Sequence, residues 1–198
     1  NALRLNQTGA RNIAIGASSL DGNLASDNVA VGNNALVANT TGADNVAVGN
    51  NALDANIDGA SNVAVGRDAL GANIGGSHNT GLGHTALMSN TTGTFNTAVG
   101  REAGRNNTTG GNNNSLGYSS NRKNITGNYN NAFGYAALYE NTAGHANSAF
   151  GDSSLNNNTA SDNAAFGHHT LKLNTSGSGN TAFGPYCLDA NTTGSNNA

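Results

Sequence analysis

Residues 28–44 read NVAVGNNALVANTTGAD, and residues 45–61 read NVAVGNNALDANIDGAS. The second stretch repeats the first with few changes, and the same pattern recurs along the whole chain. The glycine of the NVAVG segment occurs eleven times, with eight intervals of 17 residues and two of 16. These glycines are Gly16, Gly32, Gly49, Gly66, Gly83, Gly100, Gly117, Gly134, Gly151, Gly167 and Gly184. A short and nearly fixed period of this kind is typical of a solenoid.

Other positions of the repeat are equally regular. Asparagine stands four residues before every glycine and again seven residues after it, without exception. The second residue before the glycine is alanine, replaced only by Gly81 and Ser115. The residue directly before the glycine is always apolar: Ile15, Val31, Val48, Val65, Leu82, Val99, Leu116, Phe133, Phe150, Phe166 and Phe183.

The repeat predicts an all-β fold, a parallel β-solenoid of about eleven 17-residue coils that forms one domain over residues 1–198. The unit is too short for paired helices and too rich in glycine for a helix. Each coil is expected to contain two short strands, Asn-x-Ala-Val and Ala-Leu, separated by a bend at the glycine. The Asn-Thr-Thr-Gly segment is expected to form the other turn, with its glycine at positive φ. Stacked coils would give a rod roughly 50 Å long.

Three details refine this prediction. In the two 16-residue coils Ser26 and Ser161 replace the turn glycine, which indicates a different turn type there.

Stacking places each asparagine on its equivalent in the next coil, so we expect buried amide ladders rather than ligand-binding asparagines. The chain begins and ends in the middle of a repeat, so we interpret it as excised from a longer fibre protein.

The apolar residues before the glycines predict association of three chains. Because strand residues alternate between faces, Val29 and Val31 share one face and Ala30 lies on the other. Small alanine and leucine columns can fill a narrow coil, which leaves the Val/Ile/Phe column as an apolar stripe in need of a cover. Closed symmetry would cover it without forming an open-ended filament, so a homotrimer is expected. We define the trimer stripe as Val31, Val48, Val65, Leu82, Val99, Leu116, Phe133, Phe150, Phe166 and Phe183.

Composition argues against several classes of protein. The net charge of −3 and the 10% content of charged residues give no reason to expect a nucleic-acid partner. No apolar run approaches the ~18 residues of a membrane span, so this segment is not expected to insert into a membrane. The single Cys187 rules out an intrachain disulfide framework and replaces a small residue of the repeat.

The segment Asn-Val-Ala-Val-Gly followed two residues later by Ala-Leu, at residues 28–36, 45–53 and 62–70, resembles the head repeats of trimeric autotransporter adhesins. It is similar also to the Asn-Thr-Ala-Val-Gly repeats, here residues 96–100, of phage-type trimeric fibres. The resemblance implies a left-handed parallel β-roll, three chains around an axis, and an extracellular adhesive role on a cell surface or a virion. The coil of adhesin heads is usually shorter, and the additional residues here lie in the Asn-Thr-Thr-Gly turn.

The sequence gives little support for catalysis. The eleven acidic residues are scattered over variable positions and form no pair at a fixed spacing. His168 and His169 are adjacent, which is not a usual metal spacing, and solvent-facing imidazoles are expected. We therefore predict no enzyme activity, no cofactor and no metal site.

A ligand-binding surface is predicted where the pattern fails. The leucine that stands four residues after most glycines is replaced by Gly104 and Asn121 in consecutive coils. Arginine with tyrosine suits an anionic glycan or a carboxylate of a protein receptor. The candidate residues are Arg101, Arg105, Tyr118, Arg122, Lys123 and Tyr135.

A monomeric ice-binding solenoid is the alternative function. The position after the second asparagine is threonine or isoleucine in ten coils, which could form a flat ladder. Isoleucine interrupts this ladder, and the neighbouring position is mixed, so a regular two-rank threonine array is missing. Solenoids support unrelated functions, and both interpretations remain open at this point.

Overall fold

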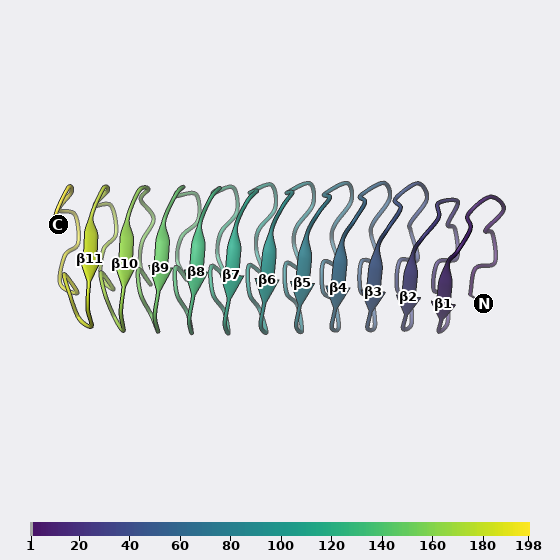
Figure 1. The fold of residues 1–198 in the computed structure, drawn as a ribbon, viewed down its shortest axis with the longest axis horizontal. Coiled ribbons are helices and arrows are strands. Elements are labelled where there is room, and N and C mark those ends of the chain that lie inside the picture. The colour runs from purple at the N-terminus through teal and green to yellow at the C-terminus, as the bar shows by residue number, and fades with distance from the viewer. Residues whose placement is uncertain (1) are drawn as a thin grey trace.

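A computed structural model describes residues 2–198 as a rod of stacked coils with one three-residue strand in each (Figure 1). The eleven strands of this part of the chain are β1 Ile13–Ile15, β2 Val29–Val31, β3 Val46–Val48, β4 Val63–Val65, β5 Thr80–Leu82, β6 Thr97–Val99, β7 Asn114–Leu116, β8 Asn131–Phe133, β9 Ser148–Phe150, β10 Ala164–Phe166 and β11 Thr181–Phe183. They form one parallel sheet in chain order, and the two ends of the chain lie at opposite ends of the rod. No helix within residues 2–198 could cross a membrane.

Every strand pairs in register with the equivalent residues of the next coil. Val29 lies beside Val46, Ala30 beside Ala47 and Val31 beside Val48. The same register holds across the 16-residue coil, where Ile13 lies beside Val29. The predicted parallel β-solenoid of 17-residue coils is therefore confirmed, because each repeat position becomes a straight column along the rod.

The interior of the rod is narrow and filled by small side chains and leucine. Ala30, Ala35 and Leu36 are fully buried, and the equivalent residues of most other coils are buried with them. Cys187 packs, half-buried, against the C-terminal part of this core. The strand alanine thus faces inward and its valine neighbours face outward, as the alternation predicted.

The prediction of a second strand at Ala-Leu is wrong. Leu36 has a φ of 53° and Asn34 a φ of 57°, both in the left-handed region. Two left-handed residues so close together bend the backbone too sharply for a strand. The segment still bonds to the next coil, since the Leu36 amide donates to the Ala52 carbonyl at 3.1 Å. The leucine column is therefore a stacked turn that points its side chains into the core.

The glycine after each strand forms the predicted bend. Gly49 has a φ of 138°, and a Cβ atom there would lie 2.5 Å from the carbonyl oxygen of Gly66 in the next coil. Both the conformation and the close approach of two backbones therefore require glycine.

The glycine of the Asn-Thr-Thr-Gly turn has a different role from the predicted one. Gly42 has no left-handed φ, and the left-handed residue of this turn is Asp44, with a φ of 59°. Gly42 is needed because a Cβ atom there would collide with the Gly59 carbonyl oxygen of the next coil and would lie 2.6 Å from Oδ1 of Asn39. The prediction that this glycine supplies positive φ is wrong, since its close approach to the next coil's backbone and to the asparagine ladder selects it.

The 16-residue coils align differently from the prediction as well. The Ala25 carbonyl accepts the Asn23 Nδ2 at 2.7 Å, just as the Gly42 carbonyl accepts the Asn39 Nδ2 at 2.8 Å. Ala25 and not Ser26 therefore occupies the turn-glycine position, and the missing residue lies between it and Asn23. Ala160 takes the same place in the second short coil, where it accepts from Asn158 at 2.8 Å.

Two buried asparagine ladders confirm the predicted structural role. Asn45 accepts the backbone N–H of Asn62 at 2.9 Å through Oδ1 and donates through Nδ2 to the Gly59 carbonyl at 2.9 Å. In the second ladder the Asn56 Nδ2 donates to Oδ1 of Asn39 at 2.7 Å. The asparagines satisfy backbone groups that turns would otherwise leave unpaired inside the rod.

Candidate functional site

A groove of about 610 Å³ runs along the turns that follow β6 to β10. One wall is built from the first and second residues after the strand glycine, and the other from the fifth residue and, at Glu140, the sixth. Glu102, Tyr118, Tyr135 and Ser153 belong to the first wall. The groove is polar and aromatic because the repeat leaves these columns variable.

Two tyrosines form an aromatic platform in the groove. Tyr118 and Tyr135 both follow a strand glycine in consecutive coils, so coil stacking places one ring on the other. Their centroids are 5.4 Å apart and their planes 9° apart. The side chains remain 41% and 57% exposed, and the guanidinium of Arg101 lies 5.8 Å from the centre of the Tyr118 ring. An exposed flat apolar surface beside polar groups suits the apolar face of a sugar ring.

Of the four predicted cations, Arg122 and Lys123 form close ion pairs with carboxylates, and Arg101 lies 3.6 Å from Glu102. Nε of Arg122 lies 2.9 Å from Oε2 of Glu102, and Nη1 of Arg122 donates to the Tyr139 hydroxyl at 2.6 Å. Nζ of Lys123 lies 2.7 Å from Oε2 of Glu140. The groove therefore offers paired charges and hydroxyls, which favours a neutral polyhydroxylated ligand over a strongly anionic one.

The structure brings together most of the six predicted ligand-binding residues. Tyr118, Arg122 and Tyr135 line the groove, and Arg101 and Lys123 contact its walls through Tyr118 and Glu140. Arg105 does not line it, and among residues 2–198 its side chain has no ion pair or hydrogen bond. Sequence reasoning missed Tyr139 and Asn156, which stand five residues after a glycine, as Arg122 does, and could have been found by aligning that column.

The hydrophobic core is interrupted beneath the groove. One apolar cluster ends at Ala103 and a second begins at Ala132. Between them lies Asn121, which is 1% exposed and whose Oδ1 has no hydrogen-bond partner. The predicted failure of the leucine column is thus also a polar gap in the core.

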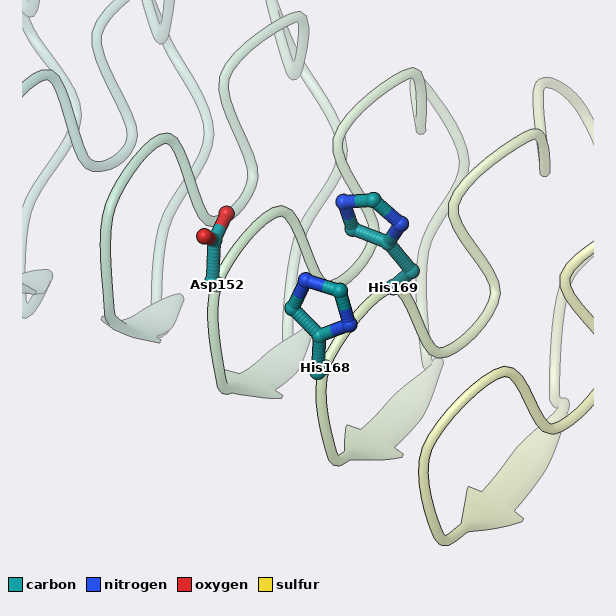
Figure 2. Close-up of side chains that lie close together, drawn as sticks. All are labelled: Asp152, His168 and His169. Carbon is teal, nitrogen blue, oxygen red and sulfur yellow. The ribbon is translucent and has the colours of Figure 1, made fainter.

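A cluster of possible metal ligands adjoins the groove. Asp152, His168 and His169 each place a ligand atom within 4.8 Å of the others (Figure 2). The pKa of His169 is lowered, chiefly by burial and then by the nearby charges of His168 and Lys172. The expectation of solvent-facing imidazoles holds for the exposed His168, whereas His169 is half-buried. The sequence signal is that Asp152 and His168 both directly follow a strand glycine in consecutive coils.

A smaller pocket of about 330 Å³ lies nearer the N-terminus and is lined by Asp54, Asp68 and Met88, among others. Burial raises the pKa of the Asp54 carboxyl, and the charge of Asp68 raises it further. This pocket has no aromatic wall, so we give it less weight as a binding site.

The outward face of the sheet carries the trimer stripe. Each stripe residue ends a strand next to a buried alanine, and the stripe side chains are half-buried or exposed. Val65 is 38% exposed and Phe183 is 77% exposed. The four phenylalanines stack from coil to coil, with successive centroids 4.6, 4.9 and 4.8 Å apart. The stripe is therefore continuous over the sheet and apolar throughout.

These features define the chain as a β-solenoid repeat protein whose variable columns decorate a regular rod. Comparisons with family models, with curated proteins and with solved structures find no match. The resemblance to trimeric fibres consequently depends on the repeat motif alone.

Proposed function

We propose that this chain is a structural and adhesive segment of an extracellular trimeric fibre on a cell surface or a virion. Its outward stripe would pack against two further copies, and its groove would bind a glycan or protein receptor. The observation that carries the proposal is the uninterrupted apolar stripe along the sheet. A long exposed apolar surface is typical of an association site.

The geometry of the rod supports a mechanical role. Every coil bonds to the next through its backbone and through the first asparagine ladder, which gives a stiff spacer. The second ladder adds bonds between most coils but is broken at Asn124 and Asn141, whose Oδ1 atoms have no partner within residues 2–198. The variable residues after each strand glycine project from this spacer without entering the core. A receptor site can therefore differ from coil to coil while the fold stays the same.

The association state tests the proposal first. Light scattering would give the native mass of the chain alone and of the chain fused to a neutral trimeriser. We expect a trimer for the chain alone, or a higher melting temperature when fusion brings three copies together. Val65→Glu should abolish this effect because it places a charge in the stripe, whereas Asn50→Glu on the exposed groove side should not. A stable monomer that gains nothing from the trimeriser contradicts the proposal.

The groove is tested separately on a glycan array. Asparagine occupies the tyrosine column at positions 33 and 50, so Tyr118→Asn with Tyr135→Asn should preserve the fold. We expect loss of binding because the stacking platform disappears. Tyr129→Asn is the matched control, since Tyr129 is 62% exposed but does not line the groove. Equal binding by all three proteins would exclude this groove as the receptor site.

The ice-binding alternative has one observation in its favour, the aligned threonines after the second asparagine. Several of their hydroxyls, however, donate to backbone carbonyls of the next coil, as Thr40 does to Ile57 at 3.1 Å. Exposed Ile57 and Ile74 also interrupt the ladder. If the chain is a stable monomer, ice-crystal shaping becomes the decisive assay for this alternative.

A further inference from the structure

Two imidazoles and a carboxylate converge at the turns that follow β9 and β10 (Figure 2). Asp152 directly follows Gly151, while His168 and His169 follow Gly167. The backbone amide of His169 donates to the Asp152 carbonyl at 2.9 Å, which fixes the two turns side by side. The register of the solenoid therefore places these three residues side by side.

The side chains are arranged to share one small ligand. One donor atom from each of the three residues lies within 4.8 Å of the others. A tetrahedral zinc ion with bonds of about 2.0–2.1 Å would hold its ligand atoms roughly 3.3 Å apart. His168 and His169 stack face to face, with ring centroids 3.8 Å apart, so one ring must rotate before both nitrogens can bind one ion. Asp152 and His168 are exposed, which leaves room for new rotamers of both side chains.

Neighbouring groups orient and cover the cluster. Ser153 donates through Oγ to Oδ1 of Asp152 at 2.7 Å, which orients the carboxylate and leaves Oδ2 free to bind a metal ion. The Tyr186 ring meets both imidazoles edge-on, with centroids 5.2 Å from His168 and 5.5 Å from His169. The cluster is thus supported on one side and open to solvent on the other.

The groups around the cluster carry charges of both signs. Asp152 and Asp189 bring negative charge near His169, and Lys172 brings positive charge. The Asp152 carboxylate is therefore the ligand that would balance the charge of a bound cation.

We propose that Asp152, His168 and His169 bind a divalent transition-metal ion, with Zn²⁺ as the best-suited ion. Imidazole nitrogen is a preferred ligand of such ions, whereas Mg²⁺ and Ca²⁺ prefer oxygen ligands. The bound ion joins the β9 and β10 coils, and water completes its coordination. None of the three ligands belongs to the trimer stripe or lines the groove, so the site goes beyond the proposed fibre role.

Isothermal titration of the 198-residue chain with ZnCl₂ tests the site. Asparagine replaces each ligand in turn, in Asp152→Asn, His168→Asn and His169→Asn. Asn33 and Asn34 occupy the same two columns, and Asn34 has a φ of 57°, equal to that of His169, so the variants should fold. His84→Asn is the matched control, because His84 also follows a strand glycine but belongs to no such cluster within residues 2–198.

We expect one zinc ion per chain and at least about tenfold weaker binding in each of the three ligand variants. The control should bind like the parent chain, and MgCl₂ should give no comparable heat. Zinc should also raise the melting temperature of the parent and of His84→Asn only. The proposal is overturned if the parent does not bind zinc, or if any of the three ligand variants binds it as tightly as the parent.

Discussion

Each buried asparagine of the first ladder serves two backbone groups of the next coil at once. Asn45 accepts the N–H of Asn62 and donates to the Gly59 carbonyl, and it is fully buried itself. Serine and threonine donate and accept through a single hydroxyl oxygen, whereas the asparagine amide places its donor and its acceptor on two separate atoms. This explains why asparagine is invariant at the position in all eleven coils.

Asn45→Ala should lower the free energy of unfolding by about 1–3 kcal/mol, because it leaves the buried Asn62 N–H without an acceptor. Urea denaturation followed by circular dichroism measures the change. Asn50→Ala in the same coil is the control, since Asn50 is exposed and its side chain makes no hydrogen bond within residues 2–198. Equal losses in the two variants would contradict the ladder's role.

Asp54 gives a prediction with a defined pH dependence. Its folded-state pKa is raised from 3.8, mainly by burial, so the ionised form opposes folding at neutral pH. That penalty is present above the folded-state pKa and disappears as the pH falls below the unfolded value. Asp54→Asn should therefore raise the urea midpoint at pH 7 but not at about pH 3.

The exposed Asp58→Asn is the control for this substitution and should leave the midpoint unchanged at both pH values. A gain for Asp54→Asn that is equally large at low pH would show that removal of charge is not the cause.

At the level of the element, the bend after each strand determines how closely coils can stack. The bend glycine of one coil lies against the bend glycine of the next, so one additional Cβ atom would push two backbones apart. The strand itself has only three residues and contributes few hydrogen bonds of its own. The stability of the element therefore depends on the glycine column as much as on the strand.

Gly49→Ala should destabilise the chain by more than about 3 kcal/mol, beyond the cost of an unfavourable φ alone. The added Cβ atom would lie 2.5 Å from the Gly66 carbonyl oxygen, and backbone cannot move aside as a side chain can. Gly22→Ala is the matched control, because the nearest atom to its Cβ would be 4.0 Å away and its φ is not left-handed. Thermal unfolding should separate the two variants clearly, and similar melting temperatures would refute the steric argument.

At the level of the whole molecule, the rod contains two apolar cores separated by a polar layer. The layer lies under the aromatic groove, where Gly104 and Asn121 replace leucine. The layer contains the side-chain carbonyl oxygen of Asn121, which is buried and has no hydrogen-bond partner. Such an unpaired polar atom lowers the free energy of unfolding. We infer that the middle of the rod is its least stable part.

Asn121→Leu should raise the free energy of unfolding by about 1–3 kcal/mol, because it removes an unpaired buried polar atom. Asn121 already has the left-handed φ of the leucine column, 50°. The reciprocal Leu53→Asn should be destabilising, since it creates the same defect in a continuous core. Calorimetry measures both, and a less stable Asn121→Leu variant would show that the polar layer is structurally required.

Much of the architecture could be predicted from the sequence, because the spacing of a repeat specifies which residues stack on one another. The glycine spacing predicted the columns, the inward alanine, the outward valine and the asparagine ladders. The Ala-Leu segment was wrongly predicted as a strand, since its composition does not reveal the left-handed φ of Leu36. The candidate groove was found only in part, because Tyr139 and Asn156 were not compared with Arg122, which stands in the same column.

The sequence by itself determined the coil length, the parallel stacking and the continuous apolar stripe, because these properties depend on periodicity alone. Only the tertiary structure decided which carboxylates neutralise Arg122 and Lys123, and that Asp152 meets His168 and His169. The physical reason is that coil stacking brings residues 16 or 17 positions apart into contact, as with Asp152 and His168 or Lys123 and Glu140. Whether such neighbours form an ion pair, a stacked pair or a metal site depends on rotamers and distances that periodicity does not specify.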